Sequence, residues 1–319
     1  MKIVHILGLL VLFISANSQE VFDEQNIQVI RKNNIKSQTC WNHAITNNIP
    51  VVEGYKNSFS QYDERGNVSE MISYKSTGKV FTMEQYKYDD FDNNIGYIRF
   101  DGSQDKITYK KAFKFDETGR KVREVGFDGA ANYRNDFKYL NNRLVEIEYY
   151  LNDILSQKRI FKYTSATIRE INVHSADGTF EFKMTQVLDA KGNVLEDVEY
   201  MPKSETVKEK TLFTYNASGM VLSEAKLKGT ILQYKKVFEY DSKGNLVSIK
   251  QEEQGVPLYE LKRYEYNAAN KLTKESFRKK ASQEFSTKEY TYDEKGLCKE
   301  VLCFYASYNY KVLFKYTYE

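Results

Sequence analysis

The segment DFDNNIGYIRFD, residues 90–101, carries oxygen-bearing side chains at a spacing that suits a cation. Asp90, Asp92 and Asn94 stand at positions i, i+2 and i+4, and Asp101 stands at i+11. Calcium loops take ligands at such alternate positions and close on an acidic residue at the twelfth position. The segment therefore predicts a calcium site, with a lengthened acidic turn as the simpler alternative.

Cys40 and His43, in TCWNHAIT, are the residue types that supply a nucleophile and a base in cysteine enzymes. His174 is the other histidine beyond the first few residues, and neither histidine has a spacing typical of a metal site or a triad. We interpret His43 as a packing residue and His174 as a solvated residue before a turn. The sequence therefore predicts no enzyme, no catalytic residue and no cofactor.

Tyrosine is unusually frequent, with 26 Tyr beside 19 Phe and one Trp. A tyrosine ring offers a flat apolar face and a polar hydroxyl, which suits stacking on sugar rings and also suits a half-exposed sheet. The candidate binding surface consists of five tyrosines: Tyr149, Tyr150, Tyr305, Tyr308 and Tyr310.

The charge balance argues against a nucleic-acid surface. The chain has 47 basic and 44 acidic residues, whereas phosphate binding needs a clustered basic excess. The basic clusters at 109–114 and 278–280 alternate with acidic and aromatic residues, which is typical of solvated strand faces. A charged fraction of 29% and a mean hydropathy of −0.63 indicate a chain that works in water.

The first residues have the pattern of a secretory signal peptide. Lys2 is followed by an apolar run at 3–14 and by the small residues of 16–18, a typical cleavage site. A run of this length is too short to span a bilayer as a helix. We therefore expect cleavage of residues 1–18 and a secreted, periplasmic or cell-surface protein. No lipoprotein cysteine stands at the cleavage site, and no membrane insertion is expected after cleavage.

Three cysteines do not form a disulfide framework, because an odd count leaves one thiol unpaired. Cys298 and Cys303 fall in one expected strand, where five residues separate them by roughly 16 Å and place them on opposite faces. That distance exceeds the ~7 Å limit for a bridge. Free buried thiols are expected, and a pairing of Cys40 across the fold stays open.

Aromatic residues before a turn recur along the chain at intervals of 24 to 27 residues. Such a period indicates a repeat protein, in which one unit cannot bury its own apolar face. Eleven positions mark the register: Tyr62, Tyr88, Phe115, Tyr139, Tyr163, Leu188, Tyr215, Tyr240, Tyr266, Tyr292 and Tyr316.

One unit, FEYDSKGNLVSI at 238–249, explains the pattern. Phe238 and Tyr240 share one face of a strand because side chains alternate. Asp241 accepts backbone N–H groups in a type I turn, and Gly244 takes the positive φ that follows it. A second turn marked by glycine returns the chain, so each unit is a β-hairpin. At 139–144 the shorter YLNNRL suits a two-residue type I′ turn.

We expect an all-β fold in which about eleven hairpins of ~25 residues form one long twisted or coiled sheet, a β-solenoid-like array. Residues 19–58 are expected to form an N-terminal cap or an atypical first repeat, beginning with either a helix or a strand, and 59–319 the repeat array. Because the chain ends inside a returning strand, an edge is expected that a neighbouring chain covers or that charged residues protect: Lys311, Lys315 and Glu319.

The turn sequences resemble the YD-repeat, or Rhs-type, family of bacterial secreted and surface proteins. The matching stretches are QYDERGNV, KFDETGRKV, VLDAKGNVL, TYNASGMVL, EYDSKGNLV, EYNAANKL and TYDEKGLC, within residues 59–319. The resemblance implies long antiparallel sheets that coil into spirals or shells, some of which enclose a C-terminal toxin. This chain departs from that pattern in its longer period and in lacking a non-repetitive C-terminal domain after the repeats.

These observations predict a secreted, non-enzymatic β-repeat scaffold or binding protein. Its partner would be a protein or a polysaccharide outside the cytoplasm. Two alternatives stay open, a carbohydrate-active enzyme and an accessory of a Rhs-type toxin system. The first would need two carboxylates brought together by folding, which one sequence cannot reveal.

Overall fold

The computed structural model describes residues 27–102 and 106–319. A helix spans residues 27–32, and a short 3-10 helix, η1, spans Ala306–Tyr308. Everything else of regular structure is strand, with these bounds: β1 (Ser37–Thr46), β2 (Ile49–Pro50), β3 (Tyr55–Tyr62), β4 (Val68–Tyr74), β5 (Val80–Tyr88), β6 (Asn94–Asp101), β7 (Lys106–Phe115), β8 (Lys121–Phe127), β9 (Asn132–Leu140), β10 (Arg143–Leu151), β11 (Ile154–Tyr163), β12 (Ile168–Ser175), β13 (Phe180–Leu188), β14 (Val194–Tyr200), β15 (Val207–Tyr215), β16 (Val221–Lys228), β17 (Ile231–Tyr240), β18 (Leu246–Glu253), β19 (Val256–Tyr266), β20 (Leu272–Phe277), β21 (Ser286–Tyr292), β22 (Cys298–Tyr305) and β23 (Tyr310–Tyr318).

The turns that follow most of the aromatic strands have the predicted chemistry. In the example that ends β17, the Asp241 carboxylate accepts the backbone N–H groups of Lys243 and Asn245 at 2.8 and 2.9 Å. Its second oxygen accepts the Asn245 side-chain amide at 2.8 Å. Gly244 has φ 87°, which a residue with a Cβ adopts only with strain. We call these connections the aspartate turns, and the connections at the opposite strand ends the second turns.

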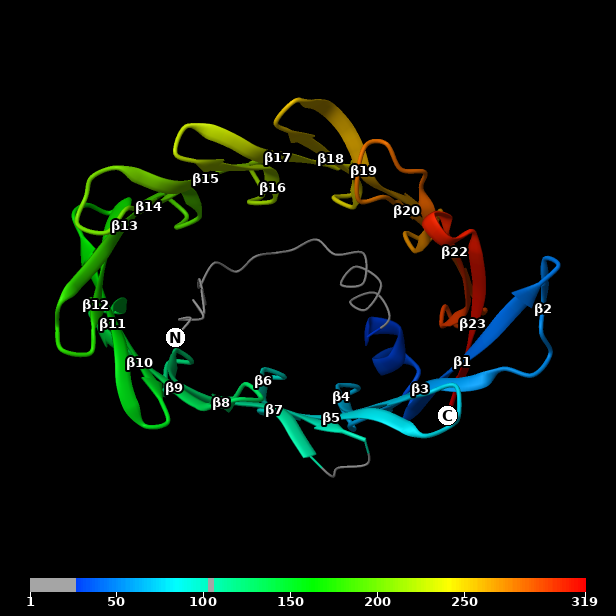
Figure 1. Cartoon of the computed structure of the whole chain (residues 1–319). Helices are drawn as coiled ribbons and strands as arrows, with labels where there is room; N and C mark the ends of the chain where they lie inside the picture. The colour runs from blue at the N-terminus through cyan, green and yellow to red at the C-terminus, as the bar shows by residue number, and fades with distance from the viewer. Residues whose placement is uncertain (1–26, 103–105) are drawn as a thin grey trace.

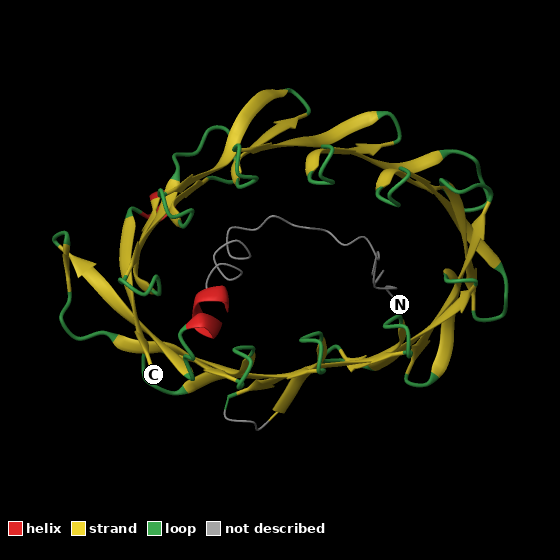
Figure 2. Cartoon of the chain, turned by 180° about the vertical axis from the view of Figure 1, so that it is seen from behind, coloured by secondary structure: helices red, strands yellow, loops and turns green. Residues whose placement is uncertain are grey.

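The strands close into a barrel, so the predicted open or coiled sheet is wrong. Of the 23 strands in the described residues, β2 pairs with β1 alone, and the other 22 form one antiparallel sheet. Strand β1 pairs with β3 on one side and with β23 on the other, which joins the two ends of the repeat array. Figures 1 and 2 show the resulting ring from its two ends.

The closure has a simple physical cause: a sheet that ends in two free edges gains a full ladder of hydrogen bonds when one extra strand joins them. Strand β1, from the segment expected as a cap, supplies that strand. The last strand, β23, is therefore not an edge open to a neighbouring chain. Lys36 and Ser37 also donate backbone hydrogen bonds to the Glu319 carbonyl, at 2.6 and 3.0 Å.

The helix at 27–32 identifies which face of the sheet is the inside. It lies within the ring in both views (Figures 1 and 2). Its buried Ile30 forms a core cluster with Tyr62, Leu297 and the partly buried Tyr318. The face that carries the register aromatics is therefore the inner wall. Among the described residues, no helix is both long and apolar enough to cross a membrane.

Tyrosine hydroxyls connect neighbouring repeats on the inner wall. Each donates to the backbone carbonyl of a residue about one repeat earlier, at 2.6 to 3.1 Å. The pairs are Tyr139–Lys121, Tyr163–Leu144, Tyr215–Val194, Tyr240–Val221, Tyr266–Leu246, Tyr292–Leu272 and Tyr318–Cys298. The final register residue is thus Tyr318 rather than Tyr316.

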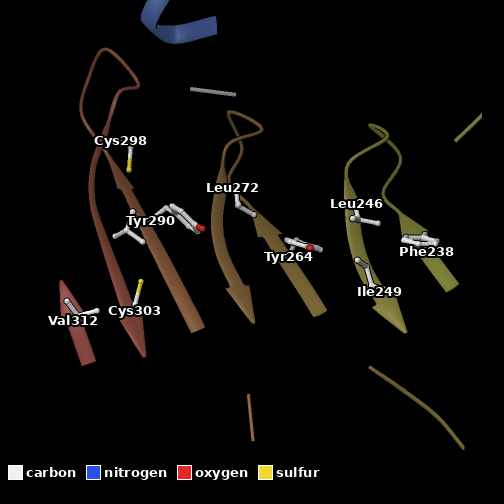
Figure 3. Close-up of a cluster of buried hydrophobic side chains, with 10 residues drawn as sticks. Phe238, Leu246, Ile249, Tyr264, Leu272, Tyr290, Cys298, Cys303 and Val312 are labelled. Carbon is white, nitrogen blue, oxygen red and sulfur yellow. The ribbon is translucent and has the colours of Figure 1, made fainter. Parts of the chain in front are cut away.

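Figure 3 shows how aromatic and aliphatic side chains alternate on the inner wall between β17 and β23. Cys298 and Cys303 both belong to this cluster, so their expected placement on opposite faces is wrong. The reason is a bulge: Thr291 pairs with Glu300 but Tyr292 pairs with Cys298, so one extra residue shifts the alternation. Both thiols and that of Cys40 are free and buried.

Candidate functional site

Four half-buried tyrosines form a band across the inner wall from β5 to β9: Tyr86, Tyr97, Tyr109 and Tyr133. The rings of Tyr86 and Tyr97 lie 5.2 Å apart, and those of Tyr97 and Tyr109 lie 5.5 Å apart. The Tyr133 hydroxyl donates to Glu124 at 3.5 Å and lies near the Tyr109 side chain, which adds to the raised pKa of Tyr133. We call this group the tyrosine band. Tyr86, Tyr97 and Tyr109 lie on adjacent strands, roughly 5 Å apart, and Tyr133 lies two strands beyond Tyr109.

A glycine lets the band continue across β8. Gly126 pairs with Lys111 on one side and with Tyr133 on the other. A Cβ at this position would lie 2.4 Å from both the Tyr133 ring and the Lys110 carbonyl. The missing side chain therefore gives the Tyr133 ring its space above β8.

Two carboxylates flank the tyrosine band, and both are neutralised. Glu84 accepts the Tyr86 hydroxyl at 2.7 Å and pairs with the Arg99 guanidinium at 3.5 Å. Glu124 pairs with Lys111 at 3.1 Å and with Lys121 at 2.9 Å. The charges near the rings are thus largely balanced within the protein itself.

The hydroxyls of Tyr86, Tyr97 and Tyr133 remain protonated at neutral pH. Burial raises the pKa of Tyr97 to about 12, with Glu84 adding to the shift. Burial also raises the pKa of Tyr86 and of Tyr133, again with help from a neighbouring carboxylate. The hydroxyls therefore act as hydrogen-bond donors and not as bases.

A pocket of about 550 Å³ opens beside the band at the end of the barrel that carries the second turns. Tyr97 and Tyr109 contribute rings, while Arg99, Asp101 and Thr108 contribute polar groups. Phe81 and Thr82 complete its lining. Aromatic walls with a few polar groups are typical of sites for small or extended ligands.

The five tyrosines chosen from the sequence do not form one surface. Tyr149 lies on the inner wall, beneath the Arg159 guanidinium. Tyr150 is its neighbour in the chain and lies on the outer wall, because side chains alternate. Tyr305 and Tyr310 stack at 6.3 Å on β22 and β23, beside the exposed Tyr308. This second group is separated from β10 by many strands of the ring (Figure 1).

The candidate calcium ligands are also not brought together. Asp92 lies in the aspartate turn after β5 and is occupied by cations of the protein itself, Arg31 at 3.3 Å and Arg65 at 3.1 Å. Asn94 begins β6 and Asp101 ends it, a separation of roughly 23 Å along the strand. Asp90 is exposed beside the turn. Within the described ranges no group of three His, Cys, Asp or Glu residues could hold a metal ion.

Cys40 and His43 lie on opposite faces of β1, since they are three residues apart. Burial raises the pKa of the Cys40 thiol to about 11, which leaves it protonated. The His43 ring is buried and lies 3.0 Å from the Val51 carbonyl through Nδ1. His174 contacts the Gly178 carbonyl in a second turn at 3.1 Å. The arrangement does not form a nucleophile and base pair.

The sequence contains a signal for the tyrosine band, although the band includes none of the five tyrosines predicted as a binding surface. Tyr109 and Tyr133 each stand six residues before a register aromatic, Phe115 and Tyr139. An even spacing places them on the same face as the register residues. Tyr97 pairs directly with Tyr86, and that match depends on the register of β5 and β6.

Comparisons with known proteins give no family. No protein-family model matches the sequence, and no curated protein matches it. Among solved structures, the chain resembles part of the TcdB2–TccC3–Cdc42 complex at 16% identity and a TM-score of 0.33, over 79% of this chain and 14% of that one. A Photorhabdus luminescens Tc holotoxin pore gives 12% sequence identity and a TM-score of 0.33, over 87% of this chain and 18% of that one. A porin-like protein from Bacteroides uniformis gives 12% sequence identity and a TM-score of 0.33, over 89% of this chain and 98% of that one. The chain thus spans less than a fifth of the toxin chains that it resembles.

Proposed function

We propose that the chain is a secreted, non-enzymatic binding protein that holds a polysaccharide against the tyrosine band. The observation that carries the proposal is the pocket at the band, in which Tyr97 and Tyr109 stand beside Arg99, Asp101 and Thr108. Aromatic rings stack on the apolar faces of sugar rings, while the polar groups bind hydroxyls. The barrel is the scaffold that holds these rings in place.

The closed sheet favours a sugar chain over an extended peptide. Peptides often bind by adding a strand to a free sheet edge, where backbone groups supply the affinity. In the described part of the chain, the barrel strands are paired on both sides through β1. A ligand on the inner wall must therefore be recognised by side chains, which suits a polysaccharide.

The inner wall has room for such a ligand. The 22 strands, set about 4.8 Å apart, give a perimeter of roughly 105 Å. Barrels of this strand number are wider than their own side chains can fill. The helix at 27–32 covers the inner wall near the aspartate turns that follow β3 and β21. We therefore place the entrance at the end with the second turns, beside the pocket.

The two neutralised carboxylates are poorly placed for glycoside cleavage. Glu84 lies on β5 and Glu124 on β8, three strands apart, which is about 14 Å. Glycosidases hold their two carboxyl groups about 5 to 9.5 Å apart. This separation supports binding without cleavage at the tyrosine band.

The leader at 1–18, which lies outside the described residues, supports a location beyond the cytoplasm. The outer wall carries charged pairs at mid-strand, including Arg123–Asp136 and Lys274–Glu289 at 2.5 and 2.7 Å. A lysine or arginine facing lipid tails costs about 2–4 kcal/mol at the bilayer midplane. These pairs support a barrel that is surrounded by water.

The test is a glycan array probed with the mature protein, the Tyr97→Ala/Tyr109→Ala variant and a matched control, Tyr305→Ala/Tyr310→Ala. The control removes a stacked tyrosine pair away from the band. We expect the band variant to lose at least about tenfold in affinity, equal to 1.4 kcal/mol, while the control binds as the wild type does. Equal loss in both variants, or no loss in the band variant, would contradict the proposal.

A further inference from the structure

An arginine that forms no ion pair within the described residues lies at the end of the tyrosine band. Arg159 on β11 is 9% exposed, and its guanidinium lies over the ring of Tyr149 at 5.1 Å. Tyr149 pairs with Asn135 on β9, two residues from Tyr133, which makes the two tyrosines diagonal neighbours on the inner wall. The row of rings therefore leads to Arg159.

Arg159 lies between apolar residues on the two neighbouring strands. Its two cross-strand partners are Ile147 and Val173, which are 4% and 0% exposed. The Nε atom is buried and has no hydrogen-bond partner among the described residues. No carboxylate oxygen of the described residues lies within the 4.0 Å ion-pair distance of the guanidinium.

Such an arrangement is costly unless something completes it. A buried charge loses its hydration and needs a counter-charge or hydrogen bonds in return. The ring of Tyr149 supplies only part of this by its cation–π contact. The Oδ1 atom of Asp197 has no hydrogen-bond partner among the described residues, and this carboxyl interacts with Arg159 at long range. Asp197 lies on β14, three strands away, and outside the ion-pair distance. The other inner arginine of this region, Arg169, already donates to Gln186 at 2.5 Å.

We propose that Arg159 binds an anionic group, a carboxylate or a sulfate, carried by the polysaccharide that lies on the tyrosine band. This inference rests on the proposed function and adds the chemical class of the ligand, an acidic polysaccharide. A guanidinium forms two parallel hydrogen bonds with a carboxylate or sulfate, which gives direction as well as charge. Arg99 and Lys111, beside the band, are neutralised by their own carboxylates and leave this role to Arg159.

The experiment compares two hexasaccharides by calorimetry, acidic hexagalacturonate and neutral cellohexaose. Wild type, Arg159→Gln and a matched control, Arg143→Gln, are titrated at low salt. Arg143 is exposed and lies over the Tyr163 ring at 4.9 Å, and it too forms no ion pair with a described residue. We expect the wild type and the control to bind the acidic hexamer at least about tenfold more tightly than the neutral one. Arg159→Gln is expected to lose that preference and to bind cellohexaose within about twofold of the wild type.

The outcomes separate this inference from the proposed function. If both hexamers bind equally to the wild type, or if Arg159→Gln keeps the preference, the anion site is refuted and the binding function stands. If neither hexamer binds, the proposed function fails, and sulfate then serves as the probe. The anion site is supported if sulfate raises the Tm above its value in chloride at equal ionic strength, and if Arg159→Gln loses this rise while Arg143→Gln keeps it. If sulfate does not raise the Tm of the wild type, the anion site is refuted too. Because the wild type buries an unpaired charge, the Tm of Arg159→Gln without ligand is expected to be unchanged or higher.

Discussion

The hydroxyl of Tyr266 donates a 2.9 Å hydrogen bond to the backbone carbonyl of Leu246, twenty residues earlier in the chain. The same bond recurs in seven repeats, so tyrosine at these positions does more than fill the inner wall. It satisfies a carbonyl at the start of the strand that follows the turn, where the bulge interrupts the ladder. At Leu188 the register position lacks the hydroxyl and cannot make this bond.

Removing one of these hydroxyls should cost stability. Tyr266→Phe is expected to lower the free energy of unfolding by about 1–3 kcal/mol, because the Leu246 carbonyl is left without its partner. Tyr310→Phe, at a position that is 46% exposed, is the control and should change it by less than about 0.5 kcal/mol. Urea denaturation measures both. Equal losses would mean that the hydrogen bond contributes nothing specific.

Gly126 should not tolerate a side chain. Gly126→Ala places a Cβ 2.4 Å from the Tyr133 ring and from a backbone carbonyl, so the ring must move and the strand must shift. We expect a loss of roughly 1–3 kcal/mol in unfolding free energy, together with weaker glycan binding. Gly96→Ala is the matched control on β6, because its nearest neighbour lies at 3.6 Å, an ordinary contact. A tolerated Gly126→Ala variant with normal binding would contradict the assigned path of the tyrosine band.

The aspartate turns should make the fold sensitive to acid. The Asn245 amide and backbone N–H groups hold the pKa of Asp241 below its ordinary 3.8. A carboxyl with a lowered folded pKa stabilises the protein above its unfolded pKa, and this contribution is lost as the pH falls through the folded pKa. The stability difference between wild type and Asp241→Asn should therefore shrink below about pH 4.

Thermal melts of the two proteins at pH 7 and at steps below pH 4 measure this difference. Asparagine already fills the same role at Asn216, whose Oδ1 accepts backbone N–H groups at 3.0 and 2.9 Å. The reciprocal variant Asn216→Asp should gain acid sensitivity. A difference that stays constant with pH in both variants would show that the turn carboxylates do not titrate in this way.

The barrel should open when β1 is removed. A variant lacking residues 27–47 leaves β3 and β23 with unpaired edges, which favour pairing between molecules. We expect self-association in analytical ultracentrifugation. A variant lacking only 27–35 keeps β1 and should retain the wild-type state. A β1-deleted chain that stays in the wild-type state would count against the closure.

The local features of the fold could be predicted from the sequence because they depend on neighbouring residues. The aspartate turns follow from Asp, Gly and two-residue spacing, and Gly244 has the expected positive φ. Asn141 and Asn142 both have positive φ, 48° and 62°, as a type I′ turn requires. The strand faces followed from alternation, except where a bulge added a residue, as at Cys298.

The closure and the site could not be predicted in this way. Strand β1 and strand β23 lie at opposite ends of the chain, and no turn connects them to reveal their pairing. The tyrosine band depends on which residues of five strands are cross-strand neighbours, and therefore on the register of each strand pair. Only the positions of all neighbouring strands reveal that the Arg159 Nε atom has no hydrogen-bond partner in the described part of the chain.

What is proposed for the inner wall requires that the barrel is closed, and a disulfide across the seam tests this directly. Thr39 of β1 and Thr317 of β23 are cross-strand partners, close enough for a bridge if both become cysteine. In a closed barrel, Thr39→Cys/Thr317→Cys forms this bridge under mild oxidation, detected by peptide mapping, while Thr39→Cys/Thr291→Cys, with Thr291 on β21, does not. A chain in which the first pair stays reduced while the protein is folded would contradict the closed barrel.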